Sequence, residues 1–391
     1  MPKVFGEVGG SAIGTHPEAV RRALIAHLGL AARDRRSFAQ TVAALGAVQM
    51  DPMRVVAPAH LLTLRLRRGP TSEAAFSRAL GSGEVFEARL KERCIVSAQD
   101  LPAAAAQFAR ARARELLDAR GLCAIAEEIL AELAKGPRYS RELGTEHRVS
   151  SFWDENPQSM KATTMALDIL AYEGRVIVTG RRRGERRYDL PGRHFPDWEQ
   201  TISAPESARR TAARHYGRTM GVFLASDPYL GWQMESAAQR RALAQEMCEA
   251  GEWQALRIDG VERSYLCTRE LAQRMEDSPA RARGAAILAP LENLLWDRRR
   301  LWDLFGFRYT WEAYTPAARR TVGPYGMPVL LDGRLVAELD AGREEDALRY
   351  RIVPRTALRE RELQRIARAG ERLARELGLT GGARQVESPG R

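Results

Sequence analysis

Gln49 and Asp51 stand two residues apart in the run Leu45–Pro52, on a segment typical of a short strand or an extended turn. Residues two apart on an extended chain point to the same side. The amide and the carboxylate would therefore project together, directly before the apolar stretch 53–66. A carboxylate can accept a proton from water while an amide orients the same molecule, so this pair could hold and activate one water.

The chain around this pair is strongly basic. Its 391 residues carry a formal net charge of +11, and the sequence pI is about 9.9. Such a balance favours a polyanionic partner, because basic side chains that meet phosphates release counterions. A genome of high GC content also enriches arginine, so it could explain the basic composition without a nucleic-acid partner. We favour nucleic acid, because the basic residues cluster along the chain.

Other kinds of chemistry lack their sequence signals. The four cysteines and six histidines show neither zinc nor disulfide spacing, and neither a P-loop nor a dinucleotide-binding glycine motif is present. We therefore expect no metal and no cofactor. The N-terminus does not resemble a signal peptide, and no apolar stretch is long enough to cross a bilayer, so we expect a cytoplasmic protein without a membrane partner.

Three helices are predicted around the Gln49–Asp51 pair. The first begins at Pro17, and the second runs from Ser37 to Leu45 and ends at Gly46. The third begins at Pro52, with Asp51 as its N-cap. Three short helices followed by a basic arm (Arg65, Arg67 and Arg68) resemble a winged-helix unit. Residues 72–120 are predicted to be mainly helical.

A second winged-helix unit fits residues 121–195. Helices are expected at 123–134, 140–144 and 160–174, followed by a β-hairpin over residues 175–191 whose turn is rich in Gly and Arg. Five of the seven residues from 181 to 187 are arginine, which favours contact with phosphate over a merely soluble loop. Residues 202–280 fit a third unit, with helices at 206–216 and 237–249 and strands at 253–258 and 261–266 joined by Asp259-Gly260.

The sequence pattern changes from residue 285 onward. Strand-like runs at 309–314, 327–331 and 334–339 predict a small antiparallel sheet or barrel, followed by an amphipathic helix over 356–378 and a disordered tail from 379. The fold class is therefore α+β and mainly helical: tandem winged-helix units in a concave arrangement, with a small C-terminal antiparallel β-barrel or sheet. The predicted domains are 1–120, 121–200, 201–284, 285–355 and 356–391.

Three blocks of sequence carry a family resemblance. They are Leu45–Leu61 with its Gln-x-Asp motif, Glu173–Pro191, and the long block Leu288–Tyr309 with Tyr314-Thr315-Pro316 after it. Over residues 18–375 the chain resembles the winged-helix DNA glycosylases that excise alkylated purines and unhook interstrand crosslinks (YcaQ/AlkZ-like). One departure is in the stretch Phe86–Cys94, where Lys91 stands in place of the histidine expected in relatives and Arg89 in place of a tryptophan.

The resemblance implies a monofunctional glycosylase that acts on double-stranded DNA carrying cationic alkylated or crosslinked purines, and we expect a monomer. The expected catalytic residues are Gln49 and Asp51. The expected DNA contacts are His60, Arg54, Arg65, Arg181, Arg182, Arg183, Arg186, Arg187, Arg298 and Arg299. For Asp51 the alternative is a helix cap alone. His60 is interpreted as a packed or phosphate-facing histidine, with a second catalytic base as the alternative. For Arg298, Arg299 and Arg300 the alternative is a solvated face, and Asp297 is interpreted as an ion-paired structural carboxylate rather than a catalytic one.

Two other functions compete with the glycosylase. A non-catalytic winged-helix DNA-binding protein, such as a transcriptional regulator, would also bind DNA with a steep salt dependence. It would have no need of a carboxylate beside the Gln49 amide, which favours the enzyme. RNA binding has less support, because no aromatic RNA-binding signature is present.

Overall fold

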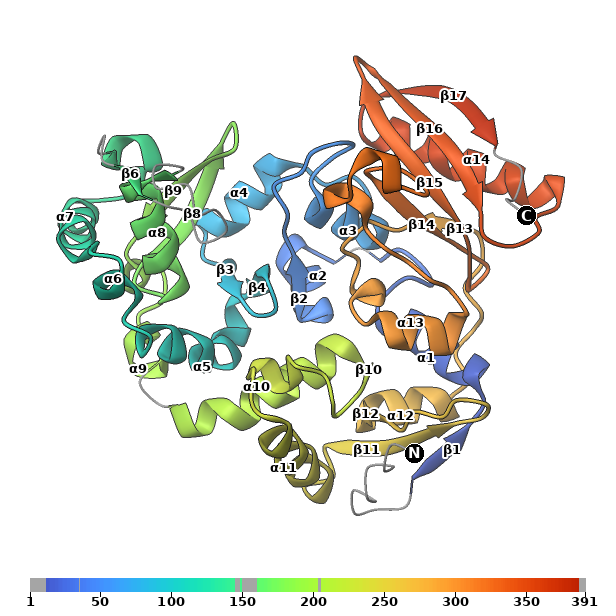
Figure 1. Ribbon diagram of the computed structural model, residues 1–391, viewed down its shortest axis with the longest axis horizontal. Coiled ribbons are helices and arrows are strands. Elements are labelled where there is room, and N and C mark those ends of the chain that lie inside the picture. The colour runs from blue at the N-terminus through green and yellow to red at the C-terminus, as the bar shows by residue number, and fades with distance from the viewer. Residues whose placement is uncertain (1–11, 35, 145–147, 150–159, 203–204, 387–391) are drawn as a thin grey trace.

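The computed structural model of the chain describes residues 12–34, 36–144, 148–149, 160–202 and 205–386. Three segments of the chain each fold as helices followed by a small sheet, and a larger sheet stands at the C-terminal end (Figure 1). No helix in these ranges is long and apolar enough to cross a membrane.

The first unit contains the predicted Gln-x-Asp motif. Its elements are α2 (Phe38–Leu45), β2 (Ala47–Gln49), α3 (Ala59–Arg68), α4 (Glu73–Gly81), β3 (Val85–Arg89) and β4 (Arg93–Ser97). They are preceded by α1 (Pro17–His27), which starts at Pro17 as predicted, and followed by α5 (Leu101–Arg112) and α6 (Leu116–Ala119). The sheet order is β2-β4-β3, so the strand before α3 pairs with the last strand. The expectation of mainly helix over 72–120 was therefore wrong for 85–97, which form an antiparallel hairpin.

The second unit has the same connectivity. It comprises α7 (Cys123–Ala134), β5 (Arg138–Tyr139), the 3-10 turn Ser140–Leu143, β6 (Arg148–Val149), β7 (Met160–Lys161), α8 (Ala162–Tyr172), β8 (Ile177–Arg182) and β9 (Glu185–Asp189). The order β5-β9-β8 again places the first strand beside the last. The predicted Arg-rich hairpin is confirmed as β8–β9, and its turn is at Arg183-Gly184, both at positive φ.

The third unit repeats this order and adds one strand. It comprises α9 (Trp198–Ile202), α10 (Pro205–Met220), β10 (Val222–Phe223), α11 (Ala237–Glu249), β11 (Trp253–Ile258), β12 (Tyr265–Thr268) and α12 (Arg269–Glu276). The N-terminal β1 (Ile13–Thr15) pairs in parallel with β11. The second strand of the predicted 253–266 hairpin starts at Tyr265 rather than at residue 261, because Leu256 pairs with Tyr265 and the connection between them is longer than the Asp-Gly turn alone.

The C-terminal sheet has five strands in sequence order. They are β13 (Ala285–Ile287), β14 (Gly326–Leu331), β15 (Arg334–Glu344), β16 (Ala347–Pro354) and β17 (Thr380–Val386), with α13 (Arg298–Phe305) before β14 and α14 (Glu360–Glu376) before β17. The sheet is open, and β17 pairs in parallel with β16, so the expected all-antiparallel sheet was wrong at this edge. The tail predicted from 379 instead supplies β17, and residues 387–391 lie outside the described ranges.

One expected strand is replaced by turns. Residues 309–314 form no strand; they lead into the 3-10 turn Glu312–Tyr314, and a second such turn follows at Ala317–Arg319. Glu312 is the cause, because its carboxylate accepts hydrogen bonds from the backbone N–H groups of Thr321, Val322 and Gly323 and closes the chain into a loop. We call residues 311–323 the Glu312 loop.

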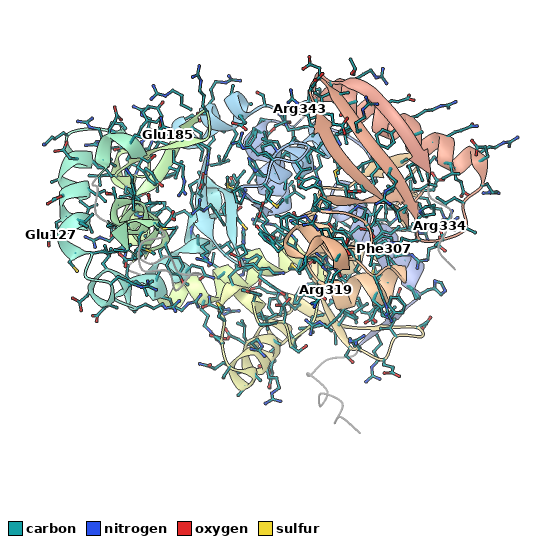
Figure 2. The ribbon with its side chains drawn as sticks, turned by 45° about the horizontal axis from the view of Figure 1, so that its top comes forward. Glu127, Glu185, Phe307, Arg319, Arg334 and Arg343 are labelled. Atoms are coloured by element: carbon teal, nitrogen blue, oxygen red, sulfur yellow. The ribbon has the colours of Figure 1, made fainter. Side chains whose placement is uncertain are left out.

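The core does not stop at the predicted boundaries. One buried apolar cluster contains Leu24 of α1, Val48 of β2, Met165 of α8 and Leu330 of β14, so it joins elements from all parts of the chain. In Figure 1, α3 and α4 lie between the β8–β9 hairpin and the C-terminal sheet. Figure 2 shows Glu185 on β9 and Arg343 on β15 at the same upper edge of the molecule.

Candidate active site at the end of β2

The backbone from Gly46 to Met50 holds the Gln49–Asp51 pair. Helix α2 ends at Gly46, which has φ +73°, and a Cβ there would collide with the Thr219 hydroxyl. Strand β2 then pairs with β4, where Gln49 faces Cys94, and the Met50 N–H donates to the Arg93 carbonyl at 2.8 Å. The chain is thus extended through Met50, which supports Gln49 and Asp51 pointing to one side.

Asp51 is not the cap of α3, contrary to our expectation. Its Oδ1 accepts the Met53 N–H at 2.7 Å, but this closes only a local turn, and α3 starts at Ala59. The helix starts late because Pro58 disfavours helical backbone just before it. Residues 52–58 instead reach the C-terminal sheet, where Val56 is buried in its core and the Val55 carbonyl accepts from the Arg343 N–H at 3.2 Å.

The Asp51 carboxylate is half-buried, accepts the Met53 N–H and lies near the Tyr314 hydroxyl. Burial raises its pKa, while the Met53 N–H and the Tyr314 hydroxyl act in the opposite direction. In the described ranges no arginine or lysine forms an ion pair with it. A carboxylate in this setting has not been neutralised by a neighbouring cation, so its charge is available to a positive ligand or to a developing positive charge.

His60 and Arg65 are both buried, so the structure does not place them at a surface that could meet DNA. His60 packs edge-on against the Phe76 ring at 5.1 Å between centroids, and burial lowers its pKa to about 3. It is therefore uncharged at neutral pH. Arg65 forms an ion pair with Glu376 of α14. Because a phosphate contact needs a side chain that reaches solvent, we leave both residues out of the proposed DNA surface.

The arginines of the β8–β9 hairpin fall into two groups. Arg181 donates to the buried carboxylate of Glu87, with its Nε at 3.2 Å, and Arg186 donates to Asp168 at 2.7 Å. These two fix the hairpin to the rest of the protein. Arg182, Arg183 and Arg187 make no hydrogen bond to a carboxylate in the described part of the chain. The guanidinium of Arg182 lies 3.9 Å from the Glu185 carboxylate.

The tip of this hairpin lies beside the segment that follows Asp51. A Cβ placed on Gly184 would be 3.6 Å from Nη2 of Arg54. The side chain of Arg54 is 49% exposed and pairs with Glu73. The structure therefore brings together two predicted DNA-contacting groups that are far apart in the sequence.

The basic run after Asp297 has three different environments. Asp297 caps α13, accepting from the Arg299 and Arg300 N–H groups at 2.9 and 3.1 Å, as its structural interpretation predicted. Arg300 is buried and donates to four backbone carbonyls, so neither phosphate contact nor solvation describes it. Arg298 is exposed above the Tyr309 ring at 4.4 Å, and Arg299 is partly exposed.

Two residues near this region were not predicted to belong to the site. Tyr314 contacts Asp51 from the Glu312 loop, and the only sequence signal was its place in the family block Tyr314-Thr315-Pro316. Lys91, at the β3–β4 turn, donates to the Trp296 carbonyl at 3.1 Å and lies 5.6 Å from the Tyr229 ring centre. Burial lowers the pKa of Lys91.

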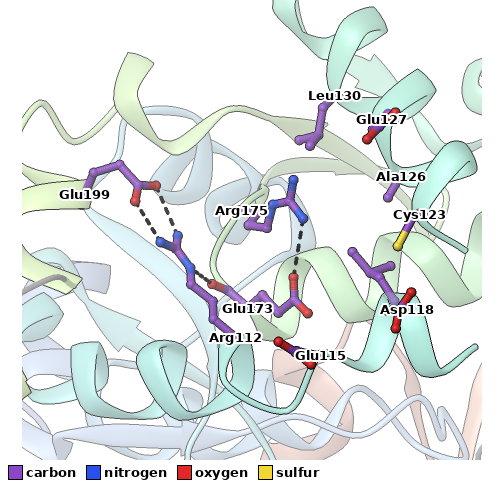
Figure 3. Close-up of a pocket in the computed structure, with 11 residues that line it drawn as sticks. Arg112, Glu115, Asp118, Cys123, Ala126, Glu127, Leu130, Glu173, Arg175 and Glu199 are labelled. Atoms are coloured by element: carbon purple, nitrogen blue, oxygen red, sulfur yellow. Dashed lines mark hydrogen bonds and ion pairs between the residues drawn. The ribbon is translucent and has the colours of Figure 1, made fainter.

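A cavity of about 660 Å³ lies elsewhere, between α5, α7 and α9 (Figure 3). Its lining includes Arg112, which donates to Glu199 at 2.8 Å, and Arg175, which lies 3.8 Å from Glu173. Neither Gln49 nor Asp51 lines this cavity. Within the described ranges no cluster of three or more His, Cys, Asp or Glu side chains could hold a metal ion.

Comparison with known proteins identifies the family. The family model of AlkZ-like DNA glycosylases matches residues 42–375. The chain belongs to the AlkZ-like DNA glycosylase family. Its fold is similar to that of the DNA glycosylase AlkZ of Streptomyces sahachiroi, with a TM-score of 0.68 and 17% identity over 96% of this chain and 100% of that chain. AlkZ-like membership confirms the resemblance and favours a DNA repair glycosylase over a regulator.

Proposed function

We propose that this AlkZ-like protein is a monofunctional DNA N-glycosylase that removes cationic N-alkylated purines, with Asp51 and Gln49 positioning the attacking water. The observation that carries this proposal is the half-buried Asp51 carboxylate, which has no cationic partner in the described chain and stands two residues after Gln49 at the end of β2.

The chemistry follows from the charge of the substrate. Alkylation at N7 or N3 makes a purine cationic and a good leaving group. When the bond between C1′ and the base nitrogen breaks, its electron pair neutralises the purine and positive charge develops on the sugar. The Asp51 carboxylate stabilises that charge and accepts a proton as water oxygen bonds to C1′. Gln49 orients the water. The products are the neutral alkylpurine and an abasic site.

Strand cleavage is not part of this proposal. A lyase step would need an amine that attacks C1′. Strand β2 pairs with β4, and Lys91 lies just before β4. The amine of Lys91, however, donates a hydrogen bond to the Trp296 carbonyl. Water is therefore the proposed nucleophile.

The proposed DNA surface uses the arginines that reach solvent. We propose that the three repeated units are winged helices in a concave arrangement, with the β8–β9 hairpin as a wing that meets the backbone or a groove. Its proposed contacts are Arg182, Arg183 and Arg187, with Arg54 beside the hairpin and Arg298 and Arg299 at α13. We propose that an open site lets the enzyme act as a monomer on an interstrand crosslink, which cannot be flipped freely into a deep pocket.

The test measures base release from duplex DNA containing 7-methylguanine and from a nitrogen-mustard crosslinked duplex. Wild type and Asp51→Asn are compared, with DNA binding measured for both. Asp259→Asn, an exposed residue at the β11–β12 turn, controls for the change of charge. We expect release by wild type and the control, and release roughly a hundredfold slower or more by Asp51→Asn with binding retained. Tight binding by wild type without release would favour the non-catalytic DNA-binding protein.

A further inference from the structure

Tyr314 is an exposed aromatic side chain that touches the proposed catalytic carboxylate. It is 75% exposed, and its hydroxyl lies close enough to the Asp51 carboxylate to lower the pKa of that group. Its ring meets the Trp311 ring edge-on, with 5.6 Å between centroids and an interplanar angle of 78°. The hydroxyl end of the side chain is therefore near Asp51 while most of the ring faces solvent.

The backbone that carries Tyr314 is rigidly braced. The Glu312 carboxylate accepts from the Thr321 N–H and hydroxyl, both at 2.8 Å, and from the N–H groups of Val322 and Gly323 at 2.9 and 3.1 Å. Arg320 Nε donates to the Thr315 carbonyl at 2.8 Å. A braced loop that holds an aromatic ring in solvent beside a half-buried carboxylate keeps the ring preorganised for a ligand at that carboxylate.

The chemical class of that ligand follows from its neighbours. An aromatic face attracts a cation and stacks on any flat base, whatever the sequence. Asp51 adds a carboxylate whose charge is not already cancelled by an arginine or lysine in the described ranges. A flat, positively charged ring satisfies both groups, whereas a neutral base satisfies only the first.

We propose that Tyr314 is the platform on which the positively charged base stacks, and that it makes the protein prefer cationic over neutral purines. This inference rests on the proposed function, since it assigns the base subsite of that same site. The phenyl ring carries the preference, and the hydroxyl serves Asp51. These two parts of one side chain can be separated by mutation.

The test uses a duplex that binds but is not cleaved. One strand carries 2′-fluoro-7-methylguanosine, whose glycosidic bond the fluorine stabilises, and a matched duplex carries unmodified guanine. The ratio of the two Kd values is measured for wild type, Tyr314→Phe and Tyr314→Leu. Trp302→Leu is the control, because Trp302 is another exposed aromatic, 46% exposed, that stacks with Arg308 instead of contacting Asp51.

We expect wild type, Tyr314→Phe and Trp302→Leu to prefer the cationic duplex about fivefold to tenfold, as a partly desolvated cation–π contact would give. Tyr314→Leu should lose that preference while binding the guanine duplex as wild type does. A wild type without preference, or a Tyr314→Leu protein that keeps it, would overturn the proposal.

Failure of the proposed function has a different signature. If the protein is not a glycosylase, the cleavable 7-methylguanine duplex stays intact while the binding ratios still report on Tyr314. If only the platform is wrong, wild type and Tyr314→Leu both release the base and show the same ratio.

Discussion

At the scale of single residues, the site depends on how the Asp51 carboxyl is tuned. Burial raises its pKa, and the donors Met53 N–H and Tyr314 hydroxyl lower it. The first donor belongs to the backbone and survives mutation, whereas the second can be removed alone. In the proposed mechanism, the pH dependence of base release therefore reports on the interaction between the Tyr314 hydroxyl and Asp51.

We predict that Tyr314→Phe moves the acidic limb of the pH–rate profile to higher pH. In the proposed mechanism, base release requires ionised Asp51 and falls as the pH drops through the Asp51 pKa. Losing the Tyr314 hydroxyl removes a group that lowers that pKa. The measurement is single-turnover release from 7-methylguanine duplex across pH, with the uncatalysed rate subtracted and Trp302→Leu as the control. An unchanged limb would show that the hydroxyl does not tune Asp51.

Residue types and spacing predicted Gln49 and Asp51, because the two are close in sequence and the extended segment between them is short. Tyr314 could not be found in this way, since the Glu312 loop is far from Asp51 in the sequence and approaches it only in the folded chain. Arg65 was assigned to DNA as part of a basic arm after three helices, and His60 was interpreted as either packed or facing a phosphate; the structure shows it packed. Arg65 is buried because Glu376 pairs with it from the other end of the chain.

At the scale of elements, turn chemistry decided which predictions succeeded. The β8–β9 and β14–β15 hairpins have Gly at their turns and were predicted. The β3–β4 hairpin turns through Leu90-Lys91-Glu92, which lacks Gly, Pro, Asn and Asp, and was taken for helix. The third helix was predicted seven residues too early because Asp51-Pro52 mimics a cap, whereas residues 52–58 form bends that bury Val56 on the distant sheet.

The β8–β9 hairpin yields a prediction of its own. Replacing both tip arginines, as in Arg182→Gln/Arg183→Gln, should weaken binding to all DNA sequences alike. The slope of log Kd against log salt should fall by about 0.9 for each phosphate that the protein no longer neutralises. Base release at saturating protein should be unchanged. Arg257→Gln on β11, an exposed arginine of the third unit, provides the matched control. A slope equal to that of wild type would remove the hairpin from the DNA surface.

At the scale of the whole molecule, one buried ion pair joins the parts that surround the site. Arg67 of α3 donates to Glu292 at 2.8 and 2.6 Å, and both side chains are almost fully buried. Arg67 also donates to the Leu28 carbonyl after α1. The next residue after Glu292, Asn293, donates to the Ala47 carbonyl of β2 at 2.9 Å. The segment before α13 thus positions the strand that ends at Gln49, which local sequence patterns could not reveal.

This arrangement predicts a strong dependence of stability on Glu292. Glu292→Leu leaves Arg67 charged and unpaired in the core, which should lower the free energy of unfolding by about 3–5 kcal/mol. Arg67→Met/Glu292→Leu removes both charges and should recover most of the loss, because two well-packed apolar side chains can replace a buried pair. Urea unfolding measures each variant, and Glu270→Gln, which breaks the exposed Arg274–Glu270 pair, should cost at most about 1 kcal/mol.

If Glu292→Leu were no worse than Glu270→Gln, the Arg67–Glu292 pair would not join α3 to the C-terminal part of the molecule. If the double variant regained stability but released bases more slowly, the pair's remaining role would be to hold β2, and with it Gln49, in position.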